Sequence, residues 1–158
     1  MTVIAEKFLV CDPVWSRLRE EAIALGRAEP VLASFVHATI LNHERLEDAL
    51  SYHLAHKLGS HDVGPLQALR VISEAFADKP SIGDEVRADL SAIFDRDPAV
   101  RTTVEPFLFF KGFLALQAYR VMHWLWGKGR TAFALHMQSR ISEVFAMDVH
   151  PAARIGRG

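Results

Sequence analysis

The most apolar stretch of the chain reads PFLFFKGFLALQAYRVMHWLW, residues 106–126, and it decides the fold class. It begins with a proline, which suits the first turn of a helix, and its apolar residues do not alternate as in a strand. Lys111, Gln117, Arg120 and His123 interrupt the run. A membrane span needs about 20 predominantly apolar residues with few or no charges. The stretch is therefore predicted to be a long helix in a core or at an interface.

Start and stop signals for further helices lie on both sides of this stretch. After it, Gly127 to Gly129 separates it from a last helix that runs through Phe145, because glycine commonly ends helices. Near the N-terminus, Asp12-Pro13 places a capping side chain before a proline at the first helical position, which predicts a helix that ends at Gly26. Further helical patterns are expected over residues 30–40, 42–58 (with Asn42 as its cap), 65–76 and 81–94.

No stretch before residue 147 shows sustained alternation, repeats or a low-complexity linker. The sequence therefore predicts an all-α fold of about seven or eight helices in a single domain, residues 1–147. Pro151 disfavours helical geometry at His150 and ends the last helix. Val149 and Ile155 are then six residues apart, the period of a hexapeptide β-helix. Residues 148–158 are interpreted either as the beginning of such a domain or as a surface loop.

Composition excludes several classes of protein. The net charge of −1, with Lys and Arg spread along the chain, provides no basic surface of the kind that nucleic-acid binding needs. Cys11 is the only cysteine, so no intramolecular disulfide is expected, which favours a reducing cytoplasm. The N-terminal sequence lacks the pattern of a signal peptide. We expect a cytoplasmic protein without a nucleic-acid partner or a membrane segment.

The histidines invite a metal-site hypothesis. His53 and His56 are three residues apart, and His61 follows. Structural zinc sites usually have four ligands with cysteine prominent, and di-iron bundles use Glu-x-x-His pairs, neither of which occurs. We predict no metal site and interpret these histidines as surface or partner-facing. His37 and His43 are interpreted as helix-end and helix-surface residues.

Motifs for nucleophilic catalysis and nucleotide binding are missing from the sequence. It contains no G-x-S-x-G, no P-loop and no G-x-G-x-x-G. Aromatic residues of the last third are predicted to form a core that another chain partly covers: Phe107, Phe109, Phe110, Phe113, Tyr119, Trp124 and Trp126.

Two carboxylates remain as candidate site residues. Asp97, in RDPAV, is either a helix N-cap or a ligand-binding group. Asp148, in DVHP, is either a solvated helix-boundary residue or a carboxylate that orients a histidine or binds a cationic substrate group. Spacing alone does not decide between these interpretations.

Four strings together resemble the N-terminal part of the serine O-acetyltransferase family. They are EPVLASFVHATILNHERLEDALSYHLAHKL from Glu29, RDPAV from Arg96, KGFLALQAYRVMHWLW from Lys111 and DVHPAARIGRG from Asp148. They occur in the family's order from about residue 11 to residue 158. The resemblance implies a helical N-terminal domain followed by a left-handed parallel β-helix that lies outside this chain, with residues 149–158 as its first strand and turn.

The resemblance also implies a reaction. Such enzymes transfer the acetyl group of acetyl-CoA, a co-substrate rather than a bound cofactor, to the hydroxyl of L-serine, giving O-acetyl-L-serine for cysteine biosynthesis. A histidine of the β-helix is the general base, and the aspartate matching Asp148 orients it. The aspartate matching Asp97 binds serine. Cysteine, which shares the amino-acid groups of serine, is the expected feedback inhibitor at the same site.

Assembly and partners follow from the same resemblance. The family forms hexamers, in which trimers are made through the β-helix and joined through the helical domains, and a C-terminal tail binds O-acetylserine sulfhydrylase. This chain lacks the general base, the acetyl-CoA groove and that tail, so the 158-residue polypeptide is expected to be inactive by itself. The alternatives are a non-catalytic helical scaffolding or oligomerisation module, and an interfacial helix over residues 107–126. The second is disfavoured because its polar residues form no cationic stripe.

Overall fold

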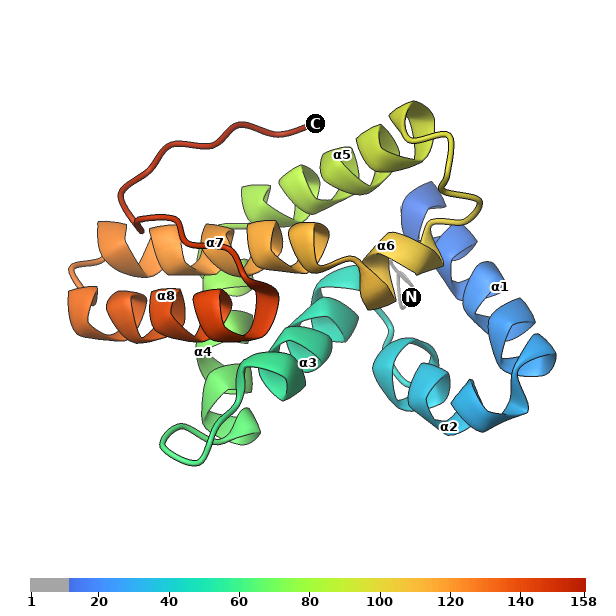
Figure 1. The fold of residues 1–158 in the computed structure, drawn as a ribbon, viewed down its shortest axis with the longest axis horizontal. Helices are drawn as coiled ribbons and strands as arrows, with labels where there is room; N and C mark the ends of the chain where they lie inside the picture. The colour runs from blue at the N-terminus through green and yellow to red at the C-terminus, as the bar shows by residue number, and fades with distance from the viewer. Residues whose placement is uncertain (1–11) are drawn as a thin grey trace, which may run out of the picture.

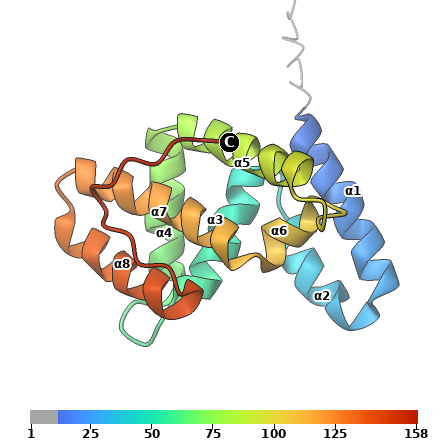
Figure 2. The ribbon, with the colours of Figure 1, turned by 45° about the horizontal axis from the view of Figure 1, so that its top comes forward.

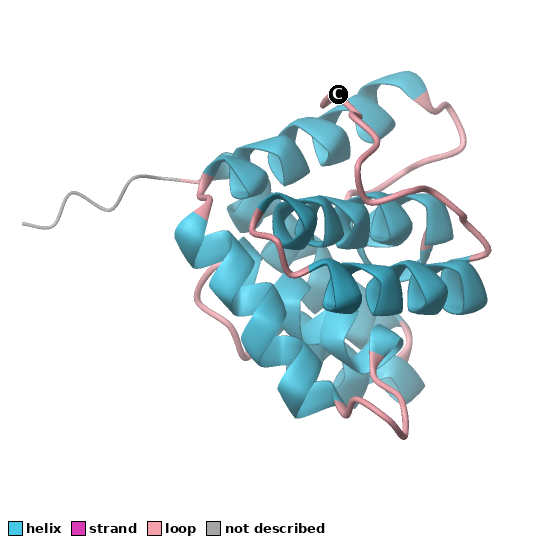
Figure 3. Ribbon diagram, turned by 90° about the vertical axis from the view of Figure 1, so that its left-hand side faces the viewer, coloured by secondary structure: helices cyan, strands magenta, loops and turns pink. Residues whose placement is uncertain are grey.

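The computed structural model describes residues 12–158, and within that range it is helical with no strand (Figures 1 and 3). The prediction of an all-α fold with seven or eight helices is confirmed. The α-helices are α1 (Pro13–Ala28), α2 (Ala33–Val36), α3 (Leu46–Leu58), α4 (Pro65–Asp78), α5 (Ser81–Arg96), α6 (Val104–Phe109), α7 (Lys111–Gly127) and α8 (Thr131–Phe145). Two short helical segments of other pitch, η1 (Pro30–Leu32) and η2 (His37–Leu41), flank α2.

Helix α7 runs through the middle of the molecule (Figure 1). Helix α8 returns along it after a turn in which Gly129 has φ 75°, a conformation that glycine adopts without strain. Helices α3 and α4 pack against each other, and α5 packs against α7. Helices α1 and α2 form one end of the molecule, and α6 connects that end to α7 (Figure 1).

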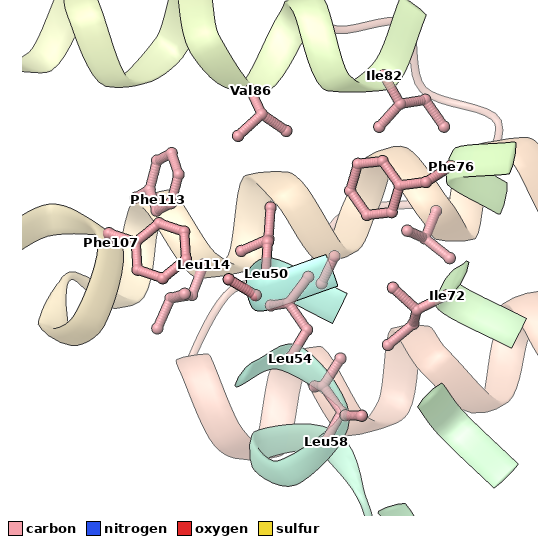
Figure 4. Packing of buried hydrophobic residues seen from close by; sticks show 14 of the residues in the cluster. Leu50, Leu54, Leu58, Ile72, Phe76, Ile82, Val86, Phe107, Phe113 and Leu114 are labelled. Atoms are coloured by element: carbon pink, nitrogen blue, oxygen red, sulfur yellow. The ribbon is translucent and has the colours of Figure 1, made fainter. Parts of the chain in front are cut away.

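The core lies between α3, α4, α5 and α7 (Figure 4). Leu50 and Leu54, one turn apart on α3, are fully buried, as is Val86 on α5. Phe107 of α6 packs against Phe113 of α7, with ring centroids 6.4 Å apart. Burial of each such side chain contributes about 1.5–3 kcal/mol, so the bundle is stabilised mainly by apolar contact.

The first predicted helix begins as expected. The Asp12 carboxylate accepts a hydrogen bond from the Trp15 N–H at 3.1 Å, which satisfies one of the unpaired N–H groups at the helix start. Arg87 of α5 donates to the same carboxylate at 2.6 Å and to Glu47 of α3 at 2.6 Å. The cap therefore also fixes α1 against two other helices.

The prediction that Asn42 caps the third helix is wrong. Asn42 ends η2, and α3 begins four residues later, at Leu46. The intervening turn is stabilised from outside, because Trp15 Nε1 donates to the Glu44 carbonyl at 2.8 Å and Arg19 donates to the His43 carbonyl at 2.5 Å. Side chains of α1 thus hold the turn through its carbonyl groups, and the start of α3 has no side-chain cap.

The prediction of one long helix from Pro106 is also wrong. The segment divides at Phe110, whose backbone is extended (φ −84°, ψ 110°). Phe107, Phe113, Tyr119 and Trp124 are buried as predicted. Phe109 and Phe110 are instead 49% and 36% exposed in the single chain. Phe107 and Phe113, which lie on either side of the break, both face the core and contact each other.

His53 corrects the surface interpretation of the histidines. It is buried between Phe35 and Phe107, and its Nε2 donates to the Leu108 carbonyl at 3.1 Å. Burial lowers the pKa of its imidazole to about 4, although the hydrogen bond to Leu108 opposes this shift. His56 is exposed, as predicted.

His61 and His37 are exposed as predicted, and His43 is partly buried, with its Nε2 3.0 Å from the Ala38 carbonyl. No group of three or more metal-ligating side chains occurs among residues 12–158. In the same range, no helix is long and apolar enough to cross a bilayer. The expectations for Cys11 and the N-terminal sequence fall outside the described residues.

Candidate functional site

The chain leaves α8 through a left-handed residue, Ala146 (φ 57°), and then changes direction. Residues 147–158, which we call the C-terminal strap, form no helix or strand. The strap crosses α7 and runs back toward α5 (Figure 2). The start of a β-helix at residue 148 therefore stays a prediction.

Helix α7 binds the strap through polar side chains. The Tyr119 hydroxyl donates to the Ala153 carbonyl and accepts from the Ile155 N–H at 3.3 Å. His123 Nδ1 donates to the Pro151 carbonyl at 2.7 Å. These contacts give the strap a defined path without regular secondary structure.

A buried carboxylate on α5 completes the attachment of the strap. Asp89 is 5% exposed, and its Oδ2 accepts from Gln117 Nε2 at 2.8 Å and Arg120 Nη2 at 2.7 Å. Its Oδ1 accepts from the Gly158 N–H at 2.9 Å. Arg120 also pairs with Glu85 and donates to the Gly156 carbonyl at 2.9 Å. Charge-assisted hydrogen bonds of this kind are about twice as strong as neutral ones.

Asp97 lies directly after α5, and the N-cap interpretation is wrong. Its N–H donates to the Ile93 carbonyl at 3.0 Å, so it ends a helix instead of starting one. Its Oδ1 accepts from the Ala99 N–H at 2.9 Å, the self-contained turn that aspartate forms readily. Val100 is buried at the end of this turn, and the next helix starts at Val104.

Asp97 borders a cavity of about 510 Å³, a size typical of small-molecule sites. The carboxylate is exposed, and its Oδ2 accepts no hydrogen bond from another residue in the range 12–158. That oxygen is available to the ammonium group of a ligand. The cavity is lined by Asp89, Ala92, Ile93, Arg96, Asp97, Pro98, Phe110, Leu116 and Gly158.

Glu21 of α1 fixes the far end of the loop that carries Asp97. Its Oε2 accepts from the Thr103 N–H at 2.7 Å, the Thr103 hydroxyl at 2.6 Å and the Val104 N–H at 3.0 Å. Two of these donors are N–H groups at the start of α6, which otherwise lack partners. The loop 97–103 is thus held at one end by α5 and at the other by α1.

Asp148 lies apart from this cavity. It is exposed in a shallow depression beside α8, and its Oδ1 accepts from Gln138 Nε2 at 3.0 Å. Asp97 does not line the depression of Asp148, and Asp148 does not line the cavity of Asp97. They lie near opposite ends of the strap, whose Gly158 shares the cavity of Asp97.

Sequence reasoning missed the buried group Asp89, Gln117 and Arg120. A signal for two of them was present, because Gln117 and Arg120 are polar residues three apart in the most apolar stretch, and so share one face of its helix. Asp89 gave no comparable signal, since it reads as an ordinary charged residue of α5.

Comparison with known proteins decides the family. The family described as "Serine acetyltransferase, N-terminal" matches residues 14–118, more than half of the chain. The chain belongs to the serine acetyltransferase family. The serine acetyltransferase of Salmonella typhimurium is 50% identical over 145 residues, which cover 92% of this chain and 53% of that protein. The chain thus spans about half the length of this relative.

Solved serine acetyltransferases have the same helical fold. The Neisseria gonorrhoeae enzyme in complex with serine is 45% identical, with a TM-score of 0.91 over 96% of this chain and 63% of that one. A serine acetyltransferase in complex with CoA has a TM-score of 0.89 at 46% identity, covering 91% and 61%. One in complex with cysteine has a TM-score of 0.90 at 46% identity, covering 91% and 60%. The resemblance seen in the sequence is therefore confirmed.

Proposed function

We propose that residues 12–158 are the helical N-terminal part of an enzyme that transfers an acetyl group from acetyl-CoA to the hydroxyl of L-serine. The product is O-acetyl-L-serine, a precursor for cysteine biosynthesis. The proposal is supported by the family and by similar serine acetyltransferases solved with serine and with CoA. Acetyl-CoA is the co-substrate, and no bound cofactor is needed.

The observation that carries the proposal is the Asp97 carboxylate at the rim of the cavity. Its Oδ1 is engaged within its own turn, which fixes the orientation of the side chain and leaves Oδ2 toward solvent. A fixed carboxylate binds the ammonium group of an amino acid through a charge-assisted hydrogen bond. We assign Asp97 to serine binding. Cysteine, with the same ammonium group, competes there as the feedback inhibitor.

Asp148 has a catalytic role through a histidine. A hydroxyl is a weak nucleophile at neutral pH, so a general base must take its proton during attack on the thioester. We assign that role to a histidine of the β-helix, as the family resemblance implies. A carboxylate that accepts from one ring nitrogen fixes the tautomer whose other nitrogen takes the proton. Asp148 is exposed near the start of the strap, which leaves it accessible to such a partner.

The experiment compares Asp97→Asn and Asp148→Asn in the acetyl-transferring enzyme that contains residues 12–158. We expect Asp97→Asn to raise the KM for serine with little change in the KM for acetyl-CoA. Asp148→Asn is expected to lower kcat by about a hundredfold or more. Asp95→Asn, an exposed neighbour on α5, serves as the control. An unchanged serine KM in Asp97→Asn would refute the assignment of that residue.

The 158-residue polypeptide alone is expected to release no CoA from acetyl-CoA in the presence of serine, because the general base lies outside it. Detectable transfer would contradict this expectation.

The wider assignments belong to the same proposal. The full-length enzyme is a cytoplasmic hexamer of two trimers that binds O-acetylserine sulfhydrylase through its C-terminal tail. Exposed apolar side chains, with Val31 86% exposed and Phe109 49% exposed, support a contact between helical domains. Sedimentation of the 158-residue chain tests this part, and monomers alone at micromolar concentration would contradict it.

A further inference from the structure

The strap and the cavity of Asp97 meet at two residues, Asp89 and Gly158, both of which line that cavity. Asp89 is the only buried carboxylate among residues 12–158. Its two oxygens are divided between two tasks, since Oδ2 accepts from α7 and Oδ1 accepts from the strap.

Arg120 of α7 also connects the bundle to the strap. It is 4% exposed, pairs with Asp89 at 2.7 Å and donates to the Gly156 carbonyl at 2.9 Å. Each member of the pair therefore makes one hydrogen bond with the strap, Arg120 with Gly156 and Asp89 with Gly158. A buried ion pair often adds little net stability compared with apolar residues of similar volume, although removing one partner is costly. Stability alone is thus a weak reason for a buried pair at this position.

We propose that Asp89 and Arg120 are positioning residues that hold the strap so that it passes the rim of the serine-binding cavity in one orientation. The inference rests on the proposed function, because it takes the Asp97 cavity as the serine site and the strap as the connection to the catalytic part of the enzyme. Through Gly156 and Gly158, the pair sets where the chain lies relative to Asp97. Neither residue is assigned a contact with the reacting atoms.

A purely structural role makes a different prediction from a positioning role. Asp89→Asn leaves the Arg120 guanidinium buried with one weaker partner, so it destabilises the bundle under either role. The double variant Asp89→Asn/Arg120→Met removes both buried charges, leaves Glu85 without its partner but partly in solvent, and is expected to restore most of the bundle stability. It does not restore the attachment of the strap, because no guanidinium remains to donate to the Gly156 carbonyl. One asparagine oxygen also cannot serve both Gln117 and Gly158 as the two carboxylate oxygens do.

The first measurement uses limited trypsin digestion of the 158-residue chain. Arg154 is exposed on the strap and reports its release, and Arg140 on α8 reports opening of the bundle. In the double variant, cleavage after Arg154 is expected to accelerate about tenfold or more while cleavage after Arg140 stays within about twofold of wild type. Cleavage after Arg154 at the wild-type rate would overturn the proposal.

A variant on the strap itself keeps the test decisive if the double variant fails to fold. Gly158→Pro removes the N–H that donates to Asp89 Oδ1, and it also moves the end of the strap because proline cannot adopt the φ of 85° at this position, while the bundle residues are unchanged. We expect cleavage after Arg154 to accelerate about threefold. No acceleration would count against the proposal. Asp95→Asn, on the same helix as Asp89 and exposed, is the matched control and should leave both cleavage rates unchanged.

The second measurement uses the acetyl-transferring enzyme. The double variant is expected to lose about tenfold in kcat/KM for serine, with a KM for acetyl-CoA within about twofold of wild type. A folded double variant with wild-type kcat/KM for serine would overturn the positioning role. If the wild-type enzyme transfers no acetyl group, the proposed function fails, and the trypsin result still decides whether the pair holds the strap.

Discussion

The helical bundle and the C-terminal strap are attached by different kinds of contact. In the bundle, fully buried side chains such as Leu50, Leu54 and Phe107 pack against other apolar side chains. The strap has fewer apolar contacts, chiefly through Pro151 and Val149, and its path depends on hydrogen bonds from Tyr119, Arg120 and other polar residues. Burial is non-directional and tolerates small adjustments, whereas hydrogen bonds require defined geometry. The bundle therefore supplies stability, and the polar face of α7 supplies position.

The largest expected effect on stability comes from the apolar core of the bundle. Phe107→Ala removes a fully buried ring and leaves a cavity beside Phe113, which should lower the free energy of unfolding by about 3–5 kcal/mol. Urea denaturation measures this loss. Phe109→Ala, on the same helix but half exposed, should cost less than about 1 kcal/mol. Equal losses in the two variants would show that α6 does not contribute to the core as described.

His53 makes the stability of the bundle depend on pH. Its pKa falls from 6.5 to about 4 on burial, so the folded state binds fewer protons than the unfolded state between these values. The bundle is therefore most stable above pH 6.5 and should lose about 3 kcal/mol as the pH falls to 4. Urea midpoints across this range test the prediction. His53→Gln should flatten this part of the profile, whereas His61→Gln should leave it unchanged.

Glu21 is an intermediate case, because it belongs to the bundle but fixes the loop 97–103 through hydrogen bonds and not through apolar contact. Glu21→Ala removes the acceptor for three donors at Thr103 and Val104 and should cost about 1–3 kcal/mol. In the enzyme it should also raise the KM for serine, because the Asp97 loop loses one of its two attachments. Glu20→Ala, the exposed neighbour, is the control. A stability loss without any change in serine KM would limit Glu21 to capping α6.

The smallest expected effect on stability comes from the strap. Tyr119→Phe keeps the buried ring and removes the hydroxyl that contacts Ala153 and Ile155. We expect a loss of about 1 kcal/mol or less in unfolding free energy. Trypsin cleavage after Arg154 should nevertheless accelerate severalfold. A large stability loss with unchanged cleavage would reverse the comparison between bundle and strap.

Local signals predicted well wherever the determining groups are neighbours in sequence. Asp12 caps α1 as expected because the carboxylate and the N–H of Trp15 are three residues apart. Asn42 failed as a cap because it ends η2 and α3 starts four residues later, after a turn whose carbonyls accept hydrogen bonds from side chains of α1. Asp97 failed as an N-cap because its N–H still bonds to α5 and only a turn follows it, so its carboxylate closes that turn and starts no helix. Spacing cannot reveal either outcome.

The residues of the candidate site also divide into those that the sequence predicted and those that only the structure reveals. Asp97 and Asp148 were selected from short strings and a family resemblance, and their roles stay predictions. The arrangement around Asp97 depends on Glu21, Asp89 and Gly158, which lie up to 76 positions earlier or 61 later in the chain. These residues could not be selected from the sequence, because an ordinary acidic residue on a helix looks the same whether it is solvated or buried.

The sequence by itself determined the helical class, most helix boundaries and the family, because periodicity, capping residues and specific strings are local properties. Only the tertiary structure decided that α6 and α7 are separate helices, that His53 is buried and that the strap returns to α5 beside Asp97. The physical reason is that burial, and the hydrogen bonds that compensate for it, depend on which distant segments come together. That choice minimises the free energy of the whole chain and not of any one segment.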